Sequence, residues 1–324
     1  MTRMITWICG AAFITSAGAV LAQTYPTKPV SIVVPFAAGG PTDVLARILA
    51  ERLARALGRQ VVVENTVGAS GSIGVGRVAK APADGYTVGI GHWSTHVVNP
   101  AVFNLNYHVM NDFDPVAMIC TNPQLVVSKK DVPARNLKEL IEWVRANQSK
   151  ISAGTAGVGA ASHIGALYFQ KQTGTSFQFV PYKGAGPAMQ DLIGGQIDLM
   201  FDQAANSLPH VRSGRIRAYA VTAKERTSAA AEIPTVDEAG LPGLYIAIWH
   251  GIWLPKGTPK EIVARLNSAI VESLADETLR SRFAELGQTM ATREQQTPQG
   301  LAAYHQSEID LWWPIIKAAN IKVE

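Results

Sequence analysis

Residues 30–58 read VSIVVPFAAGGPTDVLARILAERLARALG and decide the fold class of this chain. The first part, residues 30–35, is a continuous apolar and β-branched run, which predicts a strand buried in a parallel sheet. Apolar residues at helical spacing then predict a helix over residues 44–57, ended by Gly58. A strand, a glycine-rich turn and a helix in this order form the repeating unit of an α/β fold.

The same unit recurs along the chain, and helices dominate the last third. The remaining strands are expected at residues 61–64, 86–91, 125–128, 150–155, 177–181, 197–201 and 217–222. The remaining helices are expected at residues 71–80, 137–146, 162–173, 187–193, 260–274, 277–286 and 299–319. This alternation predicts an α/β protein whose lobes are mostly parallel sheets flanked by helices.

Two joints divide the predicted elements into two lobes. The first lies near Asn122-Pro123, and the second lies in the polar stretch at residues 223–233. We therefore expect one lobe to comprise residues 23–122 and 226–324, and the other to comprise residues 123–225.

The N-terminus has the features of a secretory signal peptide. Arg3 precedes an apolar run over residues 5–14, and small residues follow as far as Ala22. We expect cleavage after Ala22, so that residues 1–22 are the signal peptide. A membrane anchor is disfavoured because the apolar run is shorter than the roughly 18 residues that span a bilayer. Gln23 follows the expected cleavage site, where a lipidated protein would have cysteine.

The composition is that of an exported globular protein. Of the 324 residues, 47% are hydrophobic and 17% are charged, which excludes a disordered or fibrous protein. The formal net charge of +4 is scattered without a basic stripe, so no nucleic-acid partner is expected. Cys9 lies in the predicted signal peptide and Cys120 remains alone, so neither a disulfide nor a Cys-rich metal site is expected. An exported, disulfide-free protein of this size fits the bacterial periplasm.

Two glycine-rich turns are candidates for anion binding. Each joins a buried strand to the start of a helix, where free N–H groups and the helix dipole favour carboxylate or phosphate oxygens. In open α/β sheets, ligands bind beyond the carboxyl ends of the strands. The alternative is that these turns only allow tight packing of strand against helix. The candidate ligand-binding residues are Phe36, Ala38, Gly39, Gly40, Thr42 and Asp43 in the first turn, and Thr155, Gly157, Gly159, Ala160, Ser162 and His163 in the second.

Three further residues follow strands and are placed to reach the same cleft. Trp93 and Ser94 belong to an expected loop after the strand at 86–91, and Trp93 would offer a flat wall to an aromatic or aliphatic ligand. The alternative for Trp93 is a packing residue. Asp202 follows the strand at 197–201 and is placed either to accept a ligand N–H or to hold a loop. Metal ligation by His92 and His96 is disfavoured, because the glutamate of an H-E-x-x-H motif is missing between them.

Signatures of enzymes and cofactors are absent from the sequence. There is neither a phosphate-binding G-x-x-x-x-G-K-[ST] motif nor a hydrolase G-x-S-x-G motif. Residues 74–79 fit G-x-G-x-x-A but do not open directly from a strand, as a dinucleotide site requires. Ser162 and His163 are the only neighbouring nucleophile and base, and adjacent residues at a helix start point in different directions. We therefore expect no cofactor, no metal and no enzymatic activity.

The chain resembles the periplasmic solute-binding proteins of tripartite tricarboxylate transporters, the Bug or TctC-like group. The matching segments cover nearly the whole mature chain in the expected order. They are YPTKPVSIVVPFAAGGPTDVLAR (25–47), ENTVGASGSIGVGRVAKAPADGYT (64–87), STHVVNP (94–100), FDPVAMI (113–119), GVGAASHI (157–164), VPYKGAGPAMQDLIGGQIDLMFD (180–202), IPTVDEAG (233–240) and GIWLPKGTPKEIVARLN (251–267).

The resemblance implies a two-lobed Venus-flytrap fold, type II-like, that closes over one small ligand. It also implies a carboxylate held by residues 36–43 and 155–163 through backbone amides and ordered water. Val67 and Ser70 depart from the proline and glycine usual in the family. His92-Trp93 replaces small polar residues, a change that bears on ligand size.

The sequence thus favours a non-catalytic, monomeric receptor that delivers a small organic acid to the membrane permease of a tripartite tricarboxylate transporter. A dicarboxylate, a tricarboxylate, an amino acid and an aromatic acid all remain open as ligands. The alternatives are a sensor domain that presents its ligand state to a signalling partner and, least favoured, a secreted hydrolase.

Overall fold

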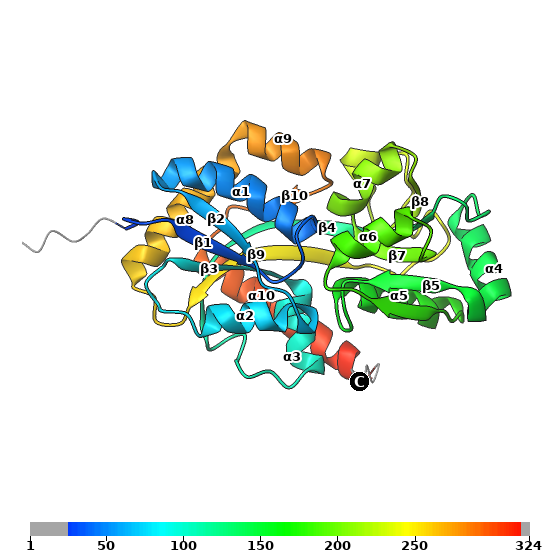
Figure 1. The fold of residues 1–324 in the computed structure, drawn as a ribbon, viewed down its shortest axis with the longest axis horizontal. Helices are drawn as coiled ribbons and strands as arrows, with labels where there is room; N and C mark the ends of the chain where they lie inside the picture. Colours follow the sequence, from blue (N-terminus) through cyan, green and yellow to red (C-terminus); the bar gives the residue numbers. More distant parts are fainter. Residues whose placement is uncertain (1–24, 319–324) are drawn as a thin grey trace, which may run out of the picture.

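The computed structural model describes residues 25–318 (Figure 1). The predicted signal peptide, residues 1–22, and its expected cleavage site lie outside the described residues. Within residues 25–318, no helix is long and apolar enough to cross a membrane.

The first lobe contains a mixed sheet with helices on both faces (Figure 1). Helices α1, α8 and α9 pack on one face, and α2 and α10 pack on the other. The strands are β1 (Val30–Val34), β2 (Val61–Asn65), β3 (Thr87–His92), β9 (Ala247–Pro255), β10 (Thr289–Met290) and the first part of β4 (Phe113–Lys129). The helices are α1 (Pro41–Leu57), α2 (Ser72–Ala79), α3 (Asn99–Val102), α8 (Lys260–Ala275), α9 (Glu277–Glu285) and α10 (Pro298–Ala318).

The second lobe repeats this layered arrangement. Helices α6 and α7 pack on one face of its sheet, and α4 and α5 pack on the other (Figure 1). The strands are the end of β4 together with β5 (Ser152–Thr155), β6 (Gln178–Pro181), β7 (Leu199–Gln203) and β8 (Ile216–Val221). The helices are α4 (Leu137–Asn147), α5 (Ala161–Thr173), α6 (Ala185–Ile193) and α7 (Ala204–Arg212). Within each lobe the early strands run parallel, as predicted, and β4 pairs antiparallel with its neighbours.

Strand β4 connects the two lobes. Its residues up to Pro123 pair with β9, and from Gln124 onward it pairs with β7 and β8. This change of partner lies between Pro123 and Gln124. Ala230 and Ile233, which follow the expected boundary at 225/226, pack in the same apolar cluster as Leu208 of α7. The chain re-enters the first sheet only with β9, which begins at Ala247 opposite Pro123.

Two local expectations are corrected by the structure. Strand β9 lies in the part of the chain expected to be mainly helical. It reads AIWHGIWLP, in which Gly251 interrupts the apolar pattern; a Cβ there would lie 2.7 Å from the Trp253 ring. The expected loop after β3 is instead a helical turn, Ser94–Val98, that leads into α3.

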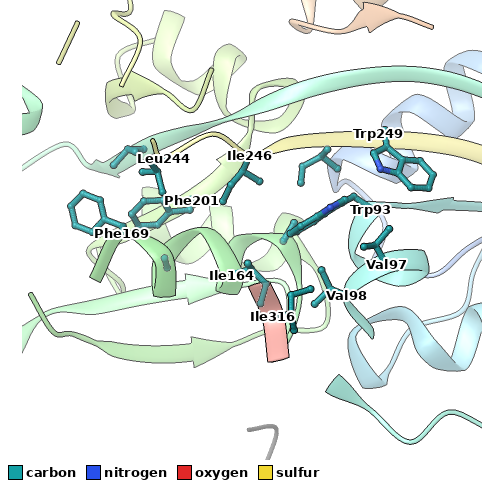
Figure 2. Packing of buried hydrophobic residues seen from close by; sticks show 14 of the residues in the cluster. Trp93, Val97, Val98, Ile164, Phe169, Phe201, Leu244, Ile246, Trp249 and Ile316 are labelled. Atoms are coloured by element: carbon teal, nitrogen blue, oxygen red, sulfur yellow. The ribbon is translucent and has the colours of Figure 1, made fainter. Parts of the chain in front are cut away.

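The hydrophobic core is continuous between the lobes. One cluster includes Trp93 and Trp249 from the first lobe and Phe169 and Phe201 from the second, with Ile316 of α10 (Figure 2). All five side chains are buried. This cluster and the strand β4 both join the two lobes, and the cavity described below lies between these lobes.

Candidate ligand-binding site

A narrow cavity lies between the two lobes. Side chains from both lobes form its wall, and most of them are buried. The lining residues are Phe36, Pro41, Thr42, His92, Gln124, Ala156, Ala160, Ala161, Ser162, Ala185, Phe201, Asp202 and Gln203.

Four helices begin at this cavity. Pro41, Ala161 and Ala185 are the first residues of α1, α5 and α6, and Gln203 is the N-cap of α7. The first N–H groups of a helix have no partner within it, and the aligned peptide dipoles place partial positive charge there. Among the described residues that line the cavity, none is Lys or Arg. The positive potential in the cavity therefore comes from backbone amides, which suits a carboxylate.

The first turn, residues 36–43, is held in place by Asp43. Its carboxylate accepts the Gly39 N–H at 2.9 Å, two bonds from Arg47 at 2.9 and 3.0 Å, and one from Asn65 at 2.9 Å. Burial opposes ionisation, but these hydrogen bonds outweigh it and hold the pKa of Asp43 below its usual range. Asp43 thus positions the turn and does not line the cavity.

The second turn, residues 155–163, is held by its own side chains. The Gly159 N–H donates to Nδ1 of His163 at 3.0 Å, and the Ala156 N–H donates to Oγ of Ser162 at 2.8 Å. Because Nδ1 accepts, the neutral His163 ring carries its proton on Nε2. Burial lowers the pKa of His163 to about 4, so the ring is neutral at physiological pH. The Ser162 hydroxyl lines the cavity and keeps its own proton to donate.

His92 is the aromatic residue that the strand end β3 presents to the cavity. Its ring stacks on Phe36, with centroids 4.8 Å apart and planes 5° from parallel. Its Nδ1 accepts the Ser94 N–H at 3.0 Å. Burial lowers the pKa of His92 to about 3, which makes the ring an uncharged part of the wall.

Asp202 lies on the opposite wall, at the end of β7. It is 2% exposed, and its Oδ2 accepts from Asn206 Nδ2 at 2.8 Å and from Ser207 Oγ at 2.7 Å. Burial raises the pKa of Asp202 to about 6, and the two hydrogen bonds act against that shift. Asp202 therefore holds the start of α7 and also lines the cavity.

The structure divides the predicted site residues into two groups. Those that line the cavity are Phe36, Thr42, Ala160, Ser162 and Asp202. Those that lie outside its lining are Ala38, Gly39, Gly40, Asp43, Trp93, Ser94, Thr155, Gly157, Gly159 and His163. Most of the second group shape the two turns through their backbone conformation and hydrogen bonds.

Trp93 is the member of that second group whose place differs most from the expectation. It is 0% exposed, and its ring meets Trp312 of α10 edge-on at 4.9 Å. In Figure 2 it lies among core side chains such as Val98 and Ile316. The structure places Trp93 in the packing role that was its alternative, while the neighbouring His92 lines the cavity.

Several lining residues were not among the predicted site residues. Ala185 begins α6 after the turn at residues 182–184, a third strand-to-helix turn that could have been recognised by the same criterion as the first two. Gln124 carries no local signal, because only the long strand β4 brings it to the cavity.

The two lobes touch on either side of the cavity. The Ala37 N–H donates to the Lys183 carbonyl at 3.2 Å, and the Ser70 hydroxyl donates to the Val158 carbonyl. Glycines allow this approach at several places, and at three of them, Gly157, Gly184 and Gly186, a Cβ would lie 2.6–3.1 Å from atoms of the other lobe. The structure is thus that of a closed form.

Within the described residues, no three His, Cys, Asp or Glu side chains come together as a metal site would need. A family profile described as "Tripartite tricarboxylate transporter family receptor" matches residues 45–321. The chain belongs to this family.

Solved structures agree with this assignment. The periplasmic binding protein BugD is 40% identical to this family member, with a TM-score of 0.90 over 93% of this chain and 100% of that one. MatC from Rhodopseudomonas palustris with bound malate is 38% identical, with a TM-score of 0.86 over 90% and 100%. The R. palustris protein Rpa4515 with adipate is 35% identical, with a TM-score of 0.87 over 92% and 99%. The two-lobed α/β fold and the Bug or TctC-like resemblance are both confirmed.

This TctC-type receptor is a periplasmic solute-binding protein, and its family is one of binding proteins rather than enzymes. The cavity between the lobes is its candidate binding site.

Proposed function

We propose that this receptor captures a small carboxylate-containing ligand between its lobes and delivers it to the permease of a tripartite tricarboxylate transporter. One observation carries the proposal: four helices begin at the cavity, and none of the described residues that line it is Lys or Arg. Such a site binds an anion through backbone amides. Two structural relatives were solved with malate and with adipate, which supports a carboxylate ligand.

Closure of the lobes is the proposed mechanism. The ligand contacts α1 from the first lobe and α5 from the second, so both sets of contacts exist only in the closed form. Binding therefore shifts the population of the protein toward that form, which the permease recognises. The contacts of Ala37 with Lys183 and of Ser70 with Val158 add to the stability of the closed form without touching the ligand.

Export and monomeric state belong to the same proposal. Residues 1–22 direct the chain to the periplasm and are removed after Ala22. The mature receptor then acts as a monomer, since one chain supplies both walls of the cavity.

Thermal unfolding of the chain from Gln23 onward tests the function. A ligand at 100 times its Kd adds about 2.7 kcal/mol, which corresponds to about 4 °C in Tm for a chain of this size. We expect such a shift with at least one short organic acid and no shift with the corresponding uncharged amide. Equal responses to an acid and its amide, or no response to any acid, would contradict a carboxylate site.

A further inference from the structure

Gln124 presents an unpaired amide to the cavity. The side chain is 1% exposed, and neither Oε1 nor Nε2 has a hydrogen-bond partner within residues 25–318. Its backbone is firmly held, since its N–H donates to Oγ1 of Thr222 at 2.9 Å and its carbonyl accepts the Thr222 N–H at 2.9 Å. Gly165 of α5 leaves room for the amide, because any Cβ there would overlap Oε1.

Buried polar groups in folded proteins are almost always hydrogen-bonded, because an unpaired one is costly. The Gln124 amide lies in the wall of the cavity, on the side of the second lobe, without a hydrogen-bond partner among the described residues. A ligand that offers hydrogen-bonding atoms would satisfy the amide.

His92 presents a matching donor from the first lobe. Its Nδ1 is occupied by the Ser94 N–H at 3.0 Å, so the neutral ring carries its proton on Nε2. His92 lines the same cavity as Gln124. The stacked ring of Phe36, at 4.8 Å, and the edge of His250, at 5.3 Å, hold the imidazole in place.

We propose that His92 and Gln124 determine specificity by binding a second oxygen acceptor of the ligand, remote from the carboxylate held at the helix N-termini. This inference rests on the proposed function. It names as ligand a short organic acid that carries a hydroxyl, carbonyl or second carboxylate oxygen. An aliphatic monoacid would leave both donors unpaired.

The two donors lie on opposite lobes and line the same cavity, so a ligand can reach both only when the lobes are together. Recognition of the second oxygen is therefore coupled to closure. Asp202 lines the same cavity with a carboxylate that repels a second carboxylate and attracts a hydroxyl hydrogen. The probes must accordingly include a hydroxy acid and a diacid of equal length.

Calorimetric titration of the chain from Gln23 onward with butyrate, 4-hydroxybutyrate and succinate tests the inference. All three share a four-carbon chain, and only butyrate lacks a second oxygen acceptor. We expect the wild type to bind the hydroxy acid or the diacid at least about tenfold more tightly than butyrate, the effect of one or two buried hydrogen bonds. The hydroxy acid and the diacid then identify which oxygen the site prefers.

Two variants remove the donors one at a time. Gln124→Met keeps the length of the side chain and removes the amide. His92→Phe keeps a ring that stacks on Phe36 and removes Nε2, together with the Nδ1 that accepts the Ser94 N–H. Each should weaken binding of the oxygen-bearing acid about tenfold and leave butyrate binding unchanged. Gln124→Met should not destabilise the free protein, because the amide has no protein partner to lose.

A matched control is available in α5. Gln172 also has a buried amide oxygen without a partner but does not line the cavity. Gln172→Met should leave the binding of all three acids unchanged.

The outcomes separate this inference from the proposed function. If the wild type binds the three acids equally, or if Gln124→Met weakens all of them alike, the inference is wrong and the carboxylate receptor stands. If the wild type binds no acid in this set or any longer one, both fall. Should His92→Phe fail to fold, the selectivity of Gln124→Met decides alone.

Discussion

Gly186 lies in the first turn of α6, where the second lobe meets the turn at residues 36–43 of the first. A Cβ at this position would lie 3.1 Å from the Ala38 carbonyl oxygen and from the Gly40 nitrogen, both backbone atoms of the other lobe. We predict that Gly186→Ala weakens ligand binding while leaving the folding of each lobe intact.

The magnitude follows from the contacts at this point. To accept the new methyl group, the lobes must separate by a few tenths of an ångström. The adjacent hydrogen bond, from the Ala37 N–H to the Lys183 carbonyl, is already 3.2 Å long and would be lost. Loss of one such bond with some residual strain costs about 1–2 kcal/mol, a 5- to 30-fold rise in Kd. In a helix, Ala is more stable than Gly by about 0.5–1 kcal/mol, so the free protein should unfold at the same or a higher temperature.

The assay is calorimetric titration with the acid that gives the largest thermal shift, together with urea unfolding of the free protein. Gly194→Ala is the control, since it lies at the other end of the same helix and its Cβ would meet only Gln190 and Asp191 of α6. Unchanged affinity in Gly186→Ala, with unchanged stability, would refute the idea that the bound form has the lobe contacts seen here.

Three further predictions concern residues around the cavity. Asp43→Asn removes the charge of the carboxylate that accepts hydrogen bonds from Gly39 and Arg47. The free energy of unfolding, measured in urea, should fall by about 1–2 kcal/mol, and an unchanged value would contradict the role of Asp43 in holding the turn. Trp93→Phe should lower stability by about 1–2 kcal/mol and leave affinity for every acid within about twofold, because the indole lies in the core; a selective loss of aromatic acids would return Trp93 to the binding site. The pKa of His163 is lowered to about 4, so its stabilising contribution is present above the unfolded value of about 6.5 and is lost as pH falls toward 4. The titration of His163 should make the free energy of unfolding about 2 kcal/mol lower at pH 5 than at pH 7, and His163→Gln should abolish this difference. Asp202 acts in the opposite sense, because its pKa is raised to about 6 and its contribution is lost as pH rises through 6, so the comparison is made between wild type and variant at each pH.

The parts of the fold that the sequence predicts are those decided by local pattern. Strand β1 and helix α1 each follow from an unbroken run or a regular spacing of apolar residues, and the structure has α1 beginning only three residues before the expected 44. At the start of α4, the Asn136 side chain accepts a hydrogen bond from the Glu139 N–H, which is the bond that an N-cap residue makes. The strand signal is local because a buried parallel strand is apolar on both faces, whichever strands lie beside it.

The parts that could not be predicted depend on partners far away in the chain. Gln124 reaches the cavity only through the long pairing of β4 with β7, and its neighbours in sequence carry no mark of this. Trp93 has the same local sequence whether it faces a ligand or the core. The contact that places Trp93 in the core is with Trp312, more than two hundred positions away in the sequence.

The pairing of Pro123 with Ala247 has a consequence for building chimaeras. The chain leaves the first lobe and returns to it at one rung of the same antiparallel ladder, so residues 124–246 form a cassette with both ends side by side. Exchanging this cassette between two members of the family would cut the sheet at a single rung, and the apolar cluster shared by the lobes would then combine side chains from both parents. A receptor assembled in this way would bring Gln124 and Asp202 from one parent to His92 and Thr42 from the other, and its ligand preference would report what each half of the wall contributes.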